Sequence, residues 1–193
     1  MVLPGTYTVS VEEKINGKVT SICPAKKFEV VSAFKQSLPV ARSKETLEFY
    51  KNAAKLIRSI RRAAGRTDEV LSQLAQIKKA LAKSAVATEN FIAETRSLTL
   101  KLTDLRELLA GRHLKAKYSE PAPISILSRA NGAMSAKGST YGPTKTNRKN
   151  YGIAREQFKH LRNKIKTLID VDFAGLQKKL DAIDLPWTSG RPF

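Results

Sequence analysis

The chain contains very few of the residue types that build covalent cross-links, metal centres or catalytic triads. Its 193 residues include one cysteine, Cys23, and two histidines, His113 and His160. A single cysteine excludes an internal disulfide and a zinc site with the usual number of cysteine ligands. Each histidine follows a cation, Arg112 or Lys159, and has no acidic neighbour in the sequence. Neither is expected to bind a metal or act as a general base, and we expect no cofactor.

Acidic residues and long apolar runs are also scarce. The 35 Lys and Arg outnumber the 17 Asp and Glu, which gives a formal net charge of +18. This excess favours negatively charged partners, but it does not determine the fold. No apolar run approaches the roughly 18 residues of a membrane span, and the first residues lack the pattern of a secretion signal. The chain therefore shows no recognisable targeting signal, although a longer protein containing it could carry one elsewhere.

The first 31 residues have the period of two that is typical of β-strands. Tyr7, Val9 and Val11 alternate with threonine and serine, and "NG" at 16–17 favours a tight hairpin turn. Residues 19–22 are expected to return as a second strand, and residues 28–31 to form a third after Pro24. Three short strands have an apolar face to bury and two open edges, so the sheet must pack against helices or against a partner.

From residue 43 onward the apolar period changes to 3.6. We expect a helix from Ser43 to Gly65, a second from Thr67 to residue 81 and a third from Thr88 to Gly111. The fourth covers residues 151–168 and begins at a Thr144 or Thr146 cap, and Asp172 is expected to restart a last segment. Residues 124–127 are expected to anchor a short helix in the long connection before it.

These patterns predict an α+β fold, mainly α, in which a short antiparallel sheet of about three strands precedes an up-down four-helix bundle. Coiled-coil seams are the alternative, but the apolar faces are wider than strict heptad stripes. We divide the chain into residues 1–33, which form the strands, and residues 34–193, which form the helices and a C-terminal tail.

Several runs along the chain resemble a known family. "LPGTYTV", "NGK", "PTKTNRKNYGIAREQF" and the terminal "PWTSGR" resemble the C-terminal region of sortilin-like, BNR-repeat bacterial exported proteins, which are often labelled glycosyl hydrolases. In that family a β-propeller and an Ig-like domain precede a helical region. The resemblance implies that residues 3–31 are the last strands of an Ig-like domain. The propeller's Asp-box signature, Ser-x-Asp-x-Gly-x-x-Trp, does not occur in this chain. No residue of this chain therefore supports the hydrolase label.

Other catalytic patterns are weak. The pairs Glu45/Glu48 and Asp104/Glu107 have a spacing that arises commonly on solvated helix faces. The stretch "KGSTYGPTKT" fails as a phosphate-binding loop because its glycines are too close together and Pro143 removes a backbone amide. No Gly-x-Ser-x-Gly elbow is present. We expect no enzyme activity from this chain.

The basic residues supply an alternative function. Residues 112–164 contain twelve Lys and Arg against two Glu. Two helical stripes are candidates for contact with nucleic acid or another polyanion. They consist of Lys51, Lys55, Arg58 and Arg62 on the first helix and Arg148, Arg155, Lys159, Arg162 and Lys166 on the fourth. The simpler interpretation is that these side chains only keep the surface soluble. Because no base-reading motif is found, any such binding is expected to be independent of sequence.

The two ends of the chain are candidates for docking. Tyr7 and Val9 lie in the first strand, and Trp187 and Arg191 lie in the terminal "PWTSGR". A single tryptophan after a helix-stopping proline is typically a packing anchor. We therefore expect a non-catalytic accessory domain that docks within a larger exported protein, its partner being a propeller or Ig-like portion or another protein chain. The alternatives are the polyanion-binding module and, more weakly, a carbohydrate-associated tail of a glycoside hydrolase.

Overall fold

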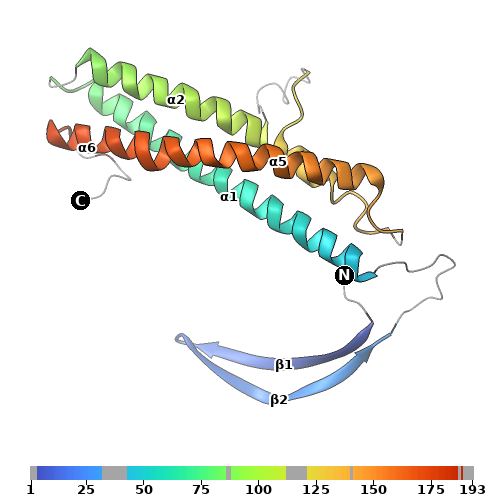
Figure 1. Cartoon of the computed structure of the whole chain (residues 1–193). Helices are drawn as coiled ribbons and strands as arrows, with labels where there is room; N and C mark the ends of the chain where they lie inside the picture. The colour runs from blue at the N-terminus through green and yellow to red at the C-terminus, as the bar shows by residue number, and fades with distance from the viewer. Residues whose placement is uncertain are drawn as a thin grey trace.

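A computed structural model describes residues 4–31, 43–85, 88–111, 121–139, 141–186 and 188 of the chain. The protein is α+β and mainly α, as expected. Figure 1 shows a curved two-stranded hairpin that lies apart from a group of long helices. No helix in these ranges is both long enough and apolar enough to cross a membrane.

The hairpin forms where the sequence predicts it, but it has two strands instead of three. Strand β1 covers Gly5–Ile15 and strand β2 covers Lys18–Val30. Asn16 and Gly17 form the turn with φ angles of 49° and 83°, the left-handed values that a tight hairpin requires. The expected break at Pro24 is wrong because β2 continues through it, and register shifts near Val11 absorb the extra residues on β2.

The first two expected helices are one helix, α1, which covers Ser43–Leu81. Thr67 does not cap a new helix, since its hydroxyl donates to the carbonyl of Ala63 at 2.9 Å inside α1. Gly65 costs about 1 kcal/mol in a helix interior, and burial of Ile60, Ala64 and Val70 on either side outweighs that cost. The four-helix bundle is therefore not confirmed, because two of its helices form a single rod.

The remaining helices pack along α1. Helix α2 covers Glu89–Ala110, α4 covers Ile126–Gly132, and α5 covers Lys145–Thr167. The wide helical turn η1, Leu168–Phe173, joins α5 to α6, Ala174–Ala182, so the expected restart at Asp172 is a change of helical pitch and not a break. Figure 1 shows α2 and the α5–α6 rod running beside α1.

One apolar core joins these helices. It contains Ile60, Val70, Leu74 and Ile77 of α1, Leu98, Leu102 and Leu109 of α2, and Phe158, Ile165, Phe173, Leu176 and Leu180 of the α5–α6 rod. A second cluster, Phe49, Tyr50, Ala53 and Ala133, lies near the start of α1. The wide apolar stripes in the sequence supply both clusters.

Asn147 holds the start of α5 in place. Thr144 and Asn147 form a capping box, which confirms the Thr144 cap, with Thr144 Oγ1 3.1 Å from the Asn147 backbone nitrogen. The buried Asn147 amide also donates to the carbonyl of Gly132 at 2.7 Å and to Ser135 Oγ at 2.8 Å. Its side chain therefore satisfies polar groups at the ends of both α4 and α5.

Candidate docking and polyanion-binding surfaces

The apolar side chains of β1 share one face of the hairpin, on which Lys26 lies opposite Val9 and Lys18 lies opposite Ile15. Tyr7 lies opposite Phe28, with their ring centroids 6.1 Å apart, and Val11 lies opposite Cys23. Because directly opposed residues share a face, these side chains belong to one surface, together with Val9 and Ile15. We call Tyr7, Val9, Val11, Ile15 and Phe28 the hairpin apolar face.

The opposite surface of the hairpin is mainly polar, although Val19 lies on it opposite Lys14. Thr6 is paired with Glu29, Thr8 with Lys27, and Glu12 with Ser21. Such a division between the two faces is typical of antiparallel sheets that bury one side and leave the other in water.

The hairpin apolar face is not covered by the described part of the chain. Val9 is 51% exposed, Ile15 59% and Phe28 49%. In the helices, by contrast, most large apolar residues lie in the core, although Leu100, Leu108 and Val171 are also more than half exposed. Tyr7 and Val9, the two predicted docking residues of the first strand, therefore lie on the same face, where Val9 is exposed and Tyr7 is half-buried. Trp187 and Arg191, the other two, lie outside the described residues.

The two edges of the hairpin differ. Along its outer edge, β2 carries Pro24, the extra residues of the register shifts, and the adjacent Lys26 and Lys27. Proline, bulges and lysine are the features by which natural edge strands avoid pairing. Strand β1 has no proline, and residues 6–11 are threonine, serine, valine and tyrosine. The β1 edge is therefore the better acceptor for another strand.

The predicted basic residues are all exposed, but they do not form a single wall. On α1, Lys51, Lys55, Arg58 and Arg62 return to one face every three or four residues. At about 100° per residue, this face lies opposite the buried Ile57 and Ile60 and so points away from the other helices.

The basic residues of α5 lie to the side of that helix. Arg155, Lys159 and Arg162 border a cavity of about 360 Å³ that Leu56 of α1 also lines. They therefore flank the seam between α5 and α1, while the α1 cations point outward.

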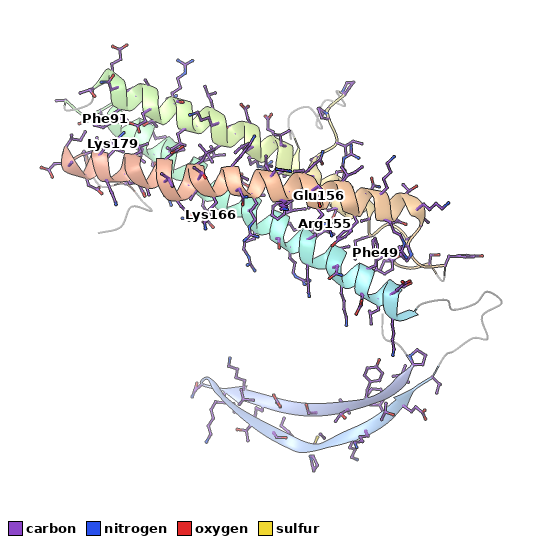
Figure 2. All side chains as sticks on the ribbon, in the orientation of Figure 1. Phe49, Phe91, Arg155, Glu156, Lys166 and Lys179 are labelled. Carbon is purple, nitrogen blue, oxygen red and sulfur yellow. The ribbon has the colours of Figure 1, made fainter. Side chains whose placement is uncertain are left out.

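Two of the predicted cations have other partners. The Arg148 guanidinium lies 5.4 Å from the centre of the Phe49 ring, and that of Arg155 lies 5.9 Å from the centre of the Tyr151 ring. Arg155 also contacts Glu156 at 3.1 Å, and this hydrogen bond and charge raise the pKa of Arg155 above its ordinary value. Figure 2 labels Phe49, Arg155 and Glu156 at this end of α5 and α1.

The aromatic cluster beneath Arg148 was not anticipated as a unit. Phe49 contacts Tyr50 and Tyr151 edge to face, with ring centroids 5.4 and 5.5 Å apart. The Tyr50 hydroxyl is buried and has no hydrogen-bond partner among the described residues. Burial raises the pKa of Tyr50, and the nearby Arg148 opposes this change in part. The helical spacing placed Tyr50 and Tyr151 in the core, but only the fold brings them to the same residue, Phe49.

The weak catalytic candidates do not converge on one site in the described residues. His160 is exposed on α5, and Glu45 and Glu48 are exposed on α1. Asp104 and Glu107 line a cavity of about 300 Å³ together with Pro123 and Ser125. Within the described ranges, no three His, Cys, Asp or Glu side chains are grouped so that they could hold a metal ion. His113 lies outside those ranges.

No protein-family model matches the chain, and no curated protein or solved structure is significantly similar to it. The resemblance to sortilin-like, BNR-repeat proteins therefore stays a prediction.

Proposed function

We propose that the protein is a non-catalytic docking module that binds a β-rich partner through its hairpin. The observation that carries this proposal is the exposed hairpin apolar face. An isolated two-stranded hairpin is at best marginally stable in water, so a long one with an apolar side is expected to gain stability from a partner.

The partner we propose is an antiparallel sheet with one open edge and an uncovered apolar face. The β1 edge would pair with the open strand of that sheet, while the hairpin apolar face would complete its core. Main-chain hydrogen bonds then supply affinity, and side chains such as Tyr7 and Phe28 supply specificity. By the sequence resemblance, this partner is the Ig-like portion of a larger propeller-containing exported protein.

The test uses a defined probe, the propeller and Ig-like portion of a sortilin-like, BNR-repeat protein prepared without its own C-terminal region. Titration calorimetry should show binding of the wild-type chain. The double variant Val9→Lys, Val11→Lys places two charges on the hairpin apolar face, and its affinity should fall by at least about tenfold, since burying an unpaired charge is costly.

A matched control adds the same charge to the polar face. The double variant Thr6→Lys, Ser10→Lys should bind within about threefold of the wild type, because neither residue enters the proposed interface. Hydrogen exchange of the complex should show new protection on β1 and little on β2. Absence of wild-type binding, or equal losses for both double variants, would refute the proposed function.

A further inference from the structure

A straight line of cations follows the outward face of α1. Lys44 joins the four predicted residues, so that the line contains Lys44, Lys51, Lys55, Arg58 and Arg62, all exposed. Their spacing of seven, four, three and four residues keeps them on one face of the helix. At about 1.5 Å per residue the line is roughly 27 Å long. We call these five residues the α1 basic line.

The charges of this line are not neutralised within the protein. In the described part of the chain, none of the five side chains forms an ion pair or a hydrogen bond, although Glu48 lies one turn from both Lys44 and Lys51. Some cations elsewhere are paired: Arg106 contacts Asp68 at 2.9 Å, and Lys179 contacts Glu94 at 2.8 Å. The line therefore presents net positive charge to solvent.

The line has a defined end. Arg66, four residues after Arg62, continues on the same face, but it contacts Glu69 at 3.0 Å and so is paired with an acidic residue. Beyond that point the exposed surface of α1 carries both acidic and basic residues. The positive charge is thus concentrated on the first half of α1.

We propose that the α1 basic line binds the phosphate backbone of a duplex nucleic acid without regard to sequence. The complementarity is one of charge, because a duplex carries about one negative charge per 1.7 Å of its axis, and a row of cations can contact several phosphates at once. A duplex is favoured over a single strand because Phe49 and Tyr50, the aromatic residues of α1, are buried and cannot stack on bases.

A membrane surface fits less well. A helix that lies in a lipid interface inserts an apolar face beside its charges. The apolar residues of this half of α1, such as Ile57 and Ile60, are buried against the other helices instead. Lys159, Arg162 and Lys166 of α5 add positive charge nearby, but on a different flank.

The experiment measures binding of a fluorescent duplex of about 20 base pairs by anisotropy, at salt concentrations between about 50 and 200 mM. Five phosphate contacts predict a slope of about −4.5 in log K against log salt, and a loss of affinity of several hundredfold across this range. The variant with all five residues of the line changed to Gln should bind at least about a hundredfold more weakly at the lowest salt and show a much smaller slope.

The control changes five other exposed cations to Gln and so removes the same net charge, from Lys78, Lys79, Lys83, Arg96 and Lys178. It should keep affinity within about fivefold of the wild type, since long-range attraction is screened at these salt concentrations. Circular dichroism confirms that both variants are folded.

Three outcomes would overturn this proposal. They are no binding at the lowest salt, equal losses for the two variants, or binding to phosphatidylcholine vesicles with about 30% phosphatidylserine but not to the duplex. None of these depends on the hairpin, so the proposal and the docking function can fail separately.

Discussion

The hairpin and the helices use similar apolar residues with opposite results. Val9 of β1 is 51% exposed, whereas Val70 of α1 is fully buried, and Phe28 of β2 is 49% exposed, whereas Phe158 of α5 is 6% exposed. The helices meet one another along wide apolar stripes, and among the described residues the hairpin has no such contact with another element. The comparison shows that alternation along a strand gathers apolar side chains on one face, whether or not the described part of the chain covers that face.

The largest test of this comparison truncates one apolar side chain in each region. Leu102→Ala should lower the free energy of unfolding of the helices by about 2 to 5 kcal/mol, because Leu102 is fully buried in their shared core. Val9→Ala should change it by less than about 0.5 kcal/mol. Urea unfolding followed by circular dichroism at 222 nm measures both. Similar losses for the two variants would show that the hairpin packs against the helical core.

A smaller change in the free energy of unfolding is expected when one glycine from each region is replaced by alanine. Gly65 lies inside α1, and a Cβ added there meets nothing within 4 Å, so Gly65→Ala should raise the free energy of unfolding by about 0.5 to 1 kcal/mol. Gly17 lies in the hairpin turn at a φ of 83°, so Gly17→Ala should strain the hairpin and leave the unfolding of the helices unchanged. A lower melting temperature for Gly65→Ala would indicate a real break in α1, as the sequence had suggested.

The smallest expected change in stability comes from the buried Tyr50. The raised pKa of Tyr50 means that the folded protein holds the phenol proton more tightly than the unfolded chain. Stability from this source is complete below about pH 10, the ordinary tyrosine value, and is lost as pH rises from there through the folded pKa. Tyr50→Phe should flatten that alkaline loss and raise stability at pH 7 by up to about 1 kcal/mol, since it removes an unpaired hydroxyl.

A hairpin tyrosine supplies the control for this measurement. Tyr7→Phe should leave the unfolding of the helices unchanged at every pH, because Tyr7 lies outside their core. Denaturant unfolding between pH 7 and about pH 11 compares the two variants with the wild type. An unaltered alkaline slope in Tyr50→Phe would contradict the assignment.

Local signals predicted much of the fold. The "NG" turn, the Thr144 cap and the short helix near Ile126 depend on neighbouring residues, and all three are confirmed. Two predictions failed where tertiary packing overrides a local signal. Gly65 looked like a helix stop, but a continuous apolar stripe keeps α1 intact, and Pro24 looked like a strand boundary, but the register shifts carry β2 past it.

The candidate surfaces were only partly predictable. Alternation placed Tyr7 and Val9 on one face, and helical spacing grouped the four cations of α1. Phe28 was missed as part of the docking surface because its pairing with Tyr7 depends on strand register. Lys44 was missed because the seven-residue gap before Lys51 hides its place on the same face. The role of Asn147 could not be predicted, since its partners are Gly132, the last residue of α4, and Ser135, which follows that helix.

The connection between Val31 and Ser43 limits how far the hairpin can travel from α1. Twelve Cα-to-Cα steps reach at most about 40 Å, whatever path the chain takes. The connection is therefore short. A partner bound at the hairpin stays at an effective concentration of roughly millimolar with respect to the first turn of α1. A partner bound at the hairpin apolar face would then lie near the α1 basic line. Two weak binding events, one at each surface, could together hold a single complex.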